Sequence, residues 1–421
     1  MLPKLPIDDC QLEMNQPVSF SFSFDPDLQE LTEQKLLHSR FPEEQTDFRE
    51  DDWSQGSKVS RIRELAEHWR TRYSWEDQER RINEIFNHYL IKMDVPEYGL
   101  VTLHYTHSMS SSPEAIPLLF VHGWPGSFLE ASKIVNELTV ANPDNDKHPT
   151  FHVVAPSIPG FGFSPAPIRS RVGPEVVAHA FKKLMTDVLG YPHFVTQGGD
   201  FGAFITRWMA IHYPDVVRAQ HLNMFPVSAP TLRSAPFAYI RWCLSGLLYS
   251  TYEKNLMRIS TAFEEDQSAY LHLQATRPQT LGFALGDSPI GLLAWVVEKL
   301  QSWIDVPESL DNDDIINLVM MHWIQAATPG LRFHREAFGE RREAERAFEA
   351  YVKIPTGVSV FPKEILACPK DWARQVANIQ FWRQHERGGH FAALECPEDL
   401  VNDLRDFFSS KAAKTSLTRQ S

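Results

Sequence analysis

The sequence predicts an α/β fold in which a mostly parallel sheet with crossover helices is interrupted by a helical insertion. Short apolar runs flanked by Gly, Pro or Asn recur from about residue 96, and helix-length spacers separate the later ones. Such alternation is typical of a parallel sheet. Between residues 225 and 350 the pattern changes to helical periodicity with few strand signals, and strand-like runs return after it.

Residues 1–95 contain no motif that suggests catalysis. Two helices are expected there, over Leu28–Ser39 and Trp75–Asn87, and Ser74 directly before the second is a good N-cap. Pro, Asp and Trp are scattered between these helices. We therefore expect an N-terminal meander that wraps the core and the insertion and has no core of its own.

The sheet domain is expected in two parts, residues 96–224 and 351–421. Its predicted strands are Leu100–Tyr105, Pro117–Val121, Phe151–Ala155, Phe194–Thr196, Gln220–Met224, Gly357–Phe361 and Ala377–Phe381. An amphipathic helix should follow over Pro397–Phe408, and the polar end Ser410–Ser421 should be frayed. The insertion, residues 225–350, is predicted to be helical, with helices such as Ile290–Leu300 and Asp314–Ile324.

Charge and cysteine usage exclude several classes of protein. The 421 residues carry 41 Lys and Arg against 54 Asp and Glu, a net charge of −13. Such a surface repels phosphate backbones, so we expect no nucleic-acid partner. The four cysteines are far apart and form no Cys-x-x-Cys pair. We expect free, mostly buried thiols and a cytoplasmic location.

Membrane insertion is not indicated. The polar stretch Met1–Gln16 has no apolar core of a secretory signal, and the most apolar helical run, Ile290–Val297, is too short to cross a bilayer. We therefore expect a soluble protein without a membrane anchor. A homodimer is compatible with the sequence, which does not fix the oligomeric state.

The stretch Gly198–Ala203 has the pattern of a sharp turn between a strand and a helix. Gly198, Gly202 and Ala203 are small, as such a turn requires, and the central residue is Asp200. The turn lifts the central side chain above the sheet edge, where a nucleophile is usually found. Because no Gly-x-Ser-x-Gly occurs in the chain, Asp200 is the candidate nucleophile; a helix-capping Asp is the alternative.

A second turn, His122–Gly126, directly follows a predicted strand. Paired with the first turn, it would bring the backbone N–H groups of Trp124 and Phe201 together as an oxyanion hole. One such donor contributes about 3–4 kcal/mol of transition-state stabilisation.

A histidine and a carboxylate complete the set. Gly388-Gly389-His390 lies between a predicted strand and the last helix, and Glu364 follows another strand-like run. The order Asp200, Glu364, His390 matches the nucleophile–acid–histidine order of α/β-hydrolases. Glu364 would orient and stabilise His390, which would activate water. A structural histidine and a surface carboxylate are the alternatives.

Jointly these motifs resemble the epoxide hydrolases of the microsomal type, in particular their soluble fungal members. The similarity runs from about residue 18 to 408, and its most specific segments are His122–Gly126, Pro159–Ser164, Gly198–Ala203, Tyr270–Thr280 and Gly388–Glu395. The resemblance implies an α/β-hydrolase core with a helical lid and a role in detoxification. It also implies that a small apolar epoxide and water give a vicinal diol through an Asp200 ester, without cofactor or metal.

The resemblance also implies two lid tyrosines that donate to the epoxide oxygen. Tyr270 matches the first, but His334 stands where the second is expected, and no tyrosine occurs between Leu271 and Ala350. Three alternatives follow: His334 donates, Tyr270 acts alone, or the natural reaction differs. Phe333 and Trp323 are further candidates for contacts with an apolar substrate.

Three other functions are compatible with the sequence. A haloalkane dehalogenase shares an Asp nucleophile, but it needs side-chain N–H donors for halide, often from a Trp where Phe201 stands here. A biosynthetic variant would open the epoxide with an internal nucleophile and form a ring. A non-hydrolytic binding homologue is supported by the missing tyrosine alone.

Overall fold

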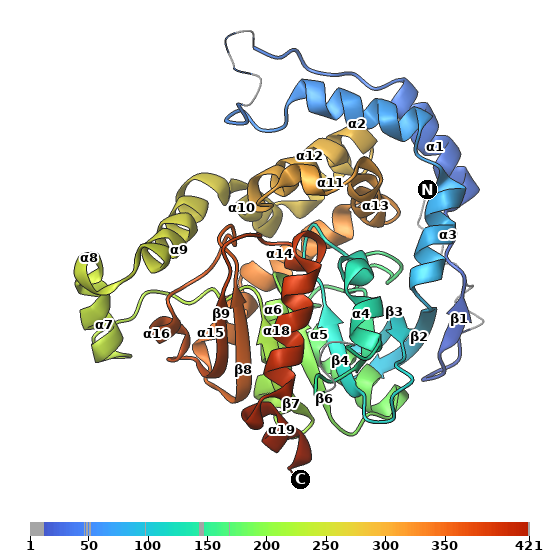
Figure 1. The fold of residues 1–421 in the computed structure, drawn as a ribbon. Helices are drawn as coiled ribbons and strands as arrows, with labels where there is room; N and C mark the ends of the chain where they lie inside the picture. Colours follow the sequence, from blue (N-terminus) through green and yellow to red (C-terminus); the bar gives the residue numbers. More distant parts are fainter. Residues whose placement is uncertain are drawn as a thin grey trace.

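A nine-stranded sheet forms the centre of the protein (Figure 1). The computed structural model describes residues 12–419, except 46, 48, 50, 51, 97, 143–146 and 168. The strands are β1 (Val18–Phe20), β2 (His88–Val95), β3 (Gly99–Ser108), β4 (Ile116–Val121), β5 (Phe151–Pro156), β6 (Phe194–Gly198), β7 (Val217–Leu222), β8 (Val352–Val360) and β9 (Ala377–Gln384). All seven predicted strand runs overlap these elements.

The strand order is β1-β2-β3-β5-β4-β6-β7-β8-β9. The first three pairings, from β1 to β5, are antiparallel, and all later ones are parallel. In the centre, Leu118 lies between Val153 and Val195 on neighbouring strands. The central strands are apolar along most of their length because helices cover both faces of a parallel sheet.

Helices α4 (Val135–Thr139), α5 (Pro174–Lys183), α6 (Phe201–His212), α16 (Lys370–Ala373), α17 (Ala392–Glu395), α18 (Pro397–Ser409) and α19 (Lys411–Thr418) belong to this sheet domain. Helix α6 packs against α5 and against β4, β6, β7 and β8, whereas α18 and α19 pack against β7 and β8. Ten residues of α6 are buried. Its N-terminus is thereby fixed at the carboxyl end of β6.

The predicted fraying of Ser410–Ser421 is wrong for the described part, which ends at residue 419. Helix α19 occupies most of it, and the Ser410 hydroxyl caps its N-terminus. Ala413 is buried, and the Ser416 hydroxyl donates to the Arg218 carbonyl at 2.6 Å. Polar composition misled the prediction because one small apolar face is enough to dock a short helix.

The N-terminal segment contains α1 (Pro26–Leu37), α2 (Val59–Thr71) and α3 (Trp75–Ile85). Ser74 caps α3, as predicted, by accepting from the Asp77 amide. The segment contacts the lid: Figure 1 shows α2 lying over the lid helices, and the Tyr73 hydroxyl donates to Asn317 at 2.7 Å. It also supplies β1 and β2, so the described part of the N-terminal segment extends the sheet as well as wrapping it.

Every regular element between β7 and β8 is helical. The helices are α7 (Pro236–Cys243), α8 (Ser245–Leu248), α9 (Thr251–Ala262), α10 (Ala269–Thr276), α11 (Pro278–Leu285), α12 (Pro289–Trp303), α13 (Asn312–Trp323), α14 (Thr328–Phe338) and α15 (Glu343–Glu349). Short 3-10 or π turns lie at Phe263–Gln267 and Pro307–Ser309, and outside the lid at Phe128–Lys133 and Leu184–Val188.

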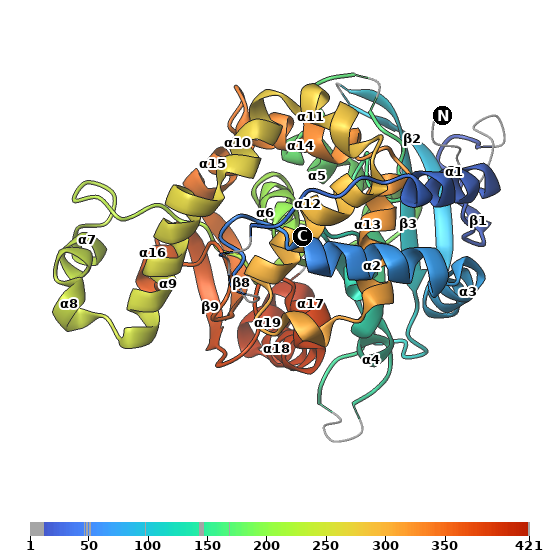
Figure 2. The same cartoon turned by 90° about the horizontal axis from the view of Figure 1, so that it is seen from above.

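Most lid helices cover the carboxyl ends of the strands, but α7 and α8 stand away from the body (Figure 2). Phe237 in α7 is 84% exposed and Leu247 in α8 is 86% exposed. None of the described helices is by itself long and apolar enough to span a membrane, although α11 and α12 meet that criterion jointly across a bend of 115°. Cys243 is an exposed free thiol, Cys368 and Cys396 are buried free thiols, and Cys10 lies outside the described residues.

Candidate active site

Asp200 occupies the sharp turn between β6 and α6. Its backbone is left-handed, with φ 48° and ψ −125°, a conformation that costs a non-Gly residue about 1–3 kcal/mol. A Cβ atom at Gly202 would overlap the Val121 carbonyl, and one at Gly198 would overlap the Gly202 backbone. The Asp200 side chain does not cap α6. The capping alternative therefore fails, and the strained turn presents the carboxylate.

Backbone donors meet this carboxylate. The Trp124 N–H donates to Asp200 Oδ1 at 2.7 Å, and the Phe201 N–H also stabilises the charge. The turn that carries Trp124 is close enough that a Cβ at Gly123 would overlap the Asp200 side chain. The two predicted oxyanion donors thus converge on the predicted nucleophile.

His390 lies between the two carboxylates. Its Nδ1 atom donates to Glu364 Oε1 at 2.8 Å, and its Nε2 atom is 3.5 Å from Asp200 Oδ2. The side chains of His390 and Glu364 are almost fully buried, whereas that of Asp200 is 19% exposed. The structure therefore brings the three residues of the predicted triad together.

The charges of the triad support one another. Burial opposes ionisation of Asp200, but the His390 hydrogen bond and charge and the backbone donors lower the pKa of Asp200 below its ordinary value. Burial likewise opposes protonation of His390, but Glu364 and Asp200 raise the pKa of this imidazole well above its ordinary value. Before reaction the site therefore holds an anionic Asp200 beside a protonated His390.

Neighbouring polar groups that sequence reasoning missed fix the histidine loop and the His122–Gly126 turn. The His390 carbonyl accepts from Asn223 Nδ2 at 3.2 Å, and its N–H donates to the Trp303 carbonyl at 3.0 Å. The Gly123 N–H donates to Glu130 at 3.4 Å, and burial raises the pKa of Glu130 to about 8. These residues lie far apart in the chain with no shared motif, so only the fold reveals them.

Tyr270 comes from α10 and lies directly above the oxyanion turn. Its ring stacks on Trp124, with centroids 5.2 Å apart and planes 15° apart. Burial raises the pKa of Tyr270 well above its usual value, and the Asp200 charge adds to this shift. The phenol is therefore protonated, and it is close enough to Asp200 for the carboxylate charge to raise its pKa, as expected of a proton donor in this site.

His334 lies beside the same group, with its ring centroid 4.8 Å from Phe201 and 5.1 Å from Trp124. Its nitrogens are engaged elsewhere. Nδ1 donates to the Gly330 carbonyl at 3.2 Å, so Nε2 accepts the 2.9 Å hydrogen bond from Gln274 Nε2. Burial lowers the pKa of His334 to about 4. In this conformation the imidazole is neutral and offers no N–H to a substrate.

The two aromatic substrate candidates lie in different places. Phe333 contacts Phe201 edge-on, with centroids 4.7 Å apart, and lines a surface hollow of about 650 Å³ beside α11 and α14. Trp323 packs against α1, where its indole N–H donates to Thr32 at 2.8 Å. Phe333 therefore reaches the candidate site, and Trp323 joins the lid to the N-terminal segment.

Comparison with known proteins gives the family. Residues 17–131 match the model described as the epoxide hydrolase N terminus, and residues 116–258 match the alpha/beta hydrolase fold. A Stigmatella aurantiaca protein named as an epoxide hydrolase is 37% identical over 390 residues, which cover 90% of this chain and 82% of the relative. This chain belongs to the epoxide hydrolase family.

Other epoxide hydrolases agree with this assignment. Epoxide hydrolase 1 of Sus scrofa is 33% identical, over 84% of this chain and 80% of that protein. The structure of the Aspergillus niger epoxide hydrolase superposes with a TM-score of 0.79 at 29% identity, covering 93% of this chain and 96% of that one. The α/β-hydrolase fold and the hydrolysis of epoxides that the sequence led us to expect are thereby confirmed.

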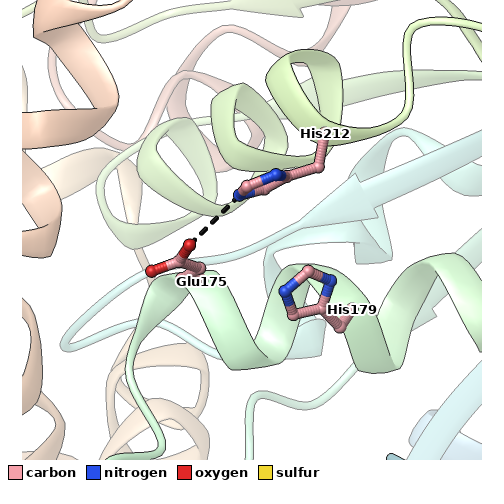
Figure 3. Close-up of side chains that lie close together, drawn as sticks. All are labelled: Glu175, His179 and His212. Carbon is pink, nitrogen blue, oxygen red and sulfur yellow. Dashed lines mark hydrogen bonds and ion pairs between the residues drawn. The ribbon is translucent and has the colours of Figure 1, made fainter. Parts of the chain in front are cut away.

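A second polar cluster of this epoxide hydrolase lies apart from the triad, on α5 and α6. Glu175, His179 and His212 form the one group of three metal-type ligands found among the described residues (Figure 3). His212 contacts Glu175 at 3.1 Å, but Arg341 also lies 3.5 Å from the same carboxylate. Because an arginine already balances the Glu175 charge, we assign no metal to this cluster.

Proposed function

We propose that this epoxide hydrolase forms diols through an ester between the substrate and Asp200. The observation that carries the proposal is the convergence on Asp200 of two backbone N–H groups and the His390 Nε2 atom at 3.5 Å. A carboxylate so placed remains ionised and can attack an epoxide carbon in line. The carbon–oxygen bond of the ring breaks as the ester bond forms.

In the first step the ring oxygen becomes an alkoxide and needs a proton. Tyr270 donates it, because its phenol lies over the Trp124 turn and remains protonated. The resulting phenolate recovers a proton from protonated His390 through water. The first step therefore ends with a neutral histidine beside a neutral ester.

In the second step His390 takes a proton from water, and the hydroxide attacks the ester carbonyl. The tetrahedral oxyanion lies against the Trp124 and Phe201 N–H groups. When it collapses, the second proton of the water goes to the leaving alkoxide, and the diol forms. Asp200 is again ionised and His390 again protonated, so the cycle closes.

His390→Gln should block the second step and trap the ester. Incubation of this variant with styrene oxide should add the mass of one substrate to the intact protein, whereas Asp200→Ala, which has no nucleophile, should add none. Intact-protein mass spectrometry measures both. An unmodified His390→Gln protein would refute the ester mechanism.

The substrate is proposed to be a small apolar epoxide, because the rings of Trp124, Tyr270, Phe201 and Phe333 pack beside the turn that carries Asp200. Haloalkane dehalogenation is disfavoured because Phe201 has no ring N–H to hold a halide. Incubating the enzyme with a panel of epoxides and with a haloalkane, while measuring diol, cyclic ether and halide, separates hydrolysis from both ring formation and dehalogenation.

Two proposals concern the cellular location and the oligomeric state of the protein. The three described cysteines are unpaired, which favours the cytoplasm. We also propose that α7, α8 and the residues beside them form a homodimer interface, since several exposed large apolar side chains on a segment that stands away from the body are unusual for a monomer (Figure 2). These exposed side chains are Leu232, Phe237, Ile240, Leu244, Leu247 and Leu248.

A further inference from the structure

A buried ammonium group lies against the ring of the proposed proton donor. Lys299 in α12 is 6% exposed, and its Nζ atom is 4.4 Å from the centroid of the Tyr270 ring. Trp124 stacks on the same ring. An indole and a cation thus both contact the Tyr270 ring, and neither a sequence motif nor the family resemblance pointed to Lys299.

The arrangement follows from the spacing on α12. Trp295, Lys299 and Trp303 are each four residues apart, so they share one face of the helix. Trp303 packs on Tyr270 with centroids 5.5 Å apart, and Lys299 also lies 5.8 Å from the Trp295 ring. One helix face thus carries both the aromatic support and the charge that the phenol meets.

A cation over an aromatic ring is attracted to the ring's electron density, and more strongly when the site is dry. When Tyr270 gives its proton to the epoxide oxygen, the phenol gains electron density. The attraction to Lys299 therefore grows on the way to the transition state, and only such differential stabilisation accelerates a step. A ground-state contact alone would not.

The Lys299 charge matters because His334 does not help Tyr270 to protonate the epoxide oxygen. Because its two nitrogens are bound to Gly330 and Gln274, it does not supply a second donor in this conformation. Glu298, which pairs with Lys299, and Asp200 both oppose loss of the phenolic proton. Within the described part of the site, Lys299 is the cation that lies against the Tyr270 ring.

We propose that Lys299 is a positioning residue that activates Tyr270 electrostatically and so speeds epoxide ring opening. The proposal rests on the proposed function, because it assigns the first proton transfer to Tyr270. It makes the ester-forming step, and not ester hydrolysis, sensitive to the charge at position 299.

The test measures ester formation in the His390→Gln background, where the ester accumulates. Each variant is mixed with styrene oxide and the reaction is quenched after short times. Intact-protein mass spectrometry of the quenched samples gives the rate of ester formation. Lys299→Met keeps the apolar stem and removes the charge, and it should slow ester formation about tenfold or more. Lys299→Arg should restore most of the rate.

Coupling to Tyr270 separates activation from packing. In a Tyr270→Phe background, Lys299→Met should cause little further loss, because the phenol through which the charge acts is gone. Glu298→Gln, which removes the neighbouring anion, should form ester at least as fast as the parent. An equal loss with and without Tyr270, or a slower Glu298→Gln variant, would overturn the proposal.

Lys182→Met is the matched control, since the Lys182 ammonium lies 5.7 Å from the Tyr213 ring, outside the catalytic group. It should leave ester formation unchanged. If Lys299→Met does not fold, Lys299→Gln and Lys299→Arg are compared instead, since only the second keeps the positive charge. Equal rates of ester formation in these two variants would refute the role of the charge. If the His390→Gln parent forms no ester, the proposed mechanism has failed and the role of Lys299 fails with it. Ester formation that does not depend on residue 299 overturns the role of Lys299 alone.

Discussion

The protonation of His390 depends on a charge that the reaction itself removes. In the resting site Asp200 and Glu364 raise the pKa of His390, but the ester is neutral, so the contribution from Asp200 disappears after ring opening. Burial, which lowers this pKa, remains. The histidine is thus an acid while the carboxylate is free and becomes a base once the ester has formed.

The change of His390 from acid to base predicts different pH profiles for ester formation and ester hydrolysis. Ester formation needs ionised Asp200, whose pKa is lowered, so its rate should be flat above about pH 5, well over the ordinary carboxyl pKa of about 3.9. Ester hydrolysis needs neutral His390, so its rate should rise as the pH increases. Single-turnover experiments measure both rates, and an ester hydrolysis rate that falls with increasing pH would contradict the assignment.

His334 provides a second residue-scale prediction. His334→Ala should slow ester formation far less than Tyr270→Phe, because neither ring nitrogen is free to donate. The substitution should reduce the free energy of unfolding by about 1–3 kcal/mol, since Gln274 loses its buried acceptor. Rapid-quench mass spectrometry and urea unfolding measure the two effects. If the two variants lose rate equally, His334 is a donor after all.

At the scale of elements, the turn between β6 and α6 leaves no room for side chains. Gly202→Ala would force a methyl group into the Val121 carbonyl, and the strand that carries this carbonyl is central to the sheet. We expect loss of activity and a stability loss of about 1–3 kcal/mol or more. Gly246→Ala on α8 meets nothing within 4 Å and is the control. Thermal unfolding compares the two variants, and equal melting temperatures would contradict this reading.

Sequence patterns predicted elements best where burial is continuous. The parallel strands and the triad turns were found because apolar runs and glycine spacing are local signals. Strands β1 and β2 and helix α2 were missed. Strand β1 has only three residues, so its pairing with β2 decides its structure, whereas α2 has buried Ile62, Leu65, Ala66 and Trp69 at helical spacing, a local signal that could have been used. The hydrogen bonds of His334 and the position of Lys299 could not be predicted, since each depends on packing between separate lid helices.

At the scale of the whole molecule, the projecting arm makes the oligomeric state testable. Leu247→Asp places a charge among the exposed apolar side chains of α7 and α8 and should convert the proposed dimer into a monomer, because a charge buried in an apolar interface costs several kcal/mol. Analytical ultracentrifugation measures the mass of the parent and of the variant. A parent that sediments as a monomer at all concentrations would refute the proposed interface.

The hydrogen bond between the His390 amide and the Trp303 carbonyl ties the catalytic loop to the end of α12. A lid that only covered the pocket could move without displacing the triad. Here His390, the base that activates water, is hydrogen-bonded to lid helix α12, and Lys299 lies one turn away from Trp303 on the same helix. The Gly388 N–H also donates to Asp305 Oδ2 at 3.0 Å, just beyond α12, so two backbone groups of the catalytic loop are held at this end of the helix. A movement of α12 would therefore also displace the base that activates water.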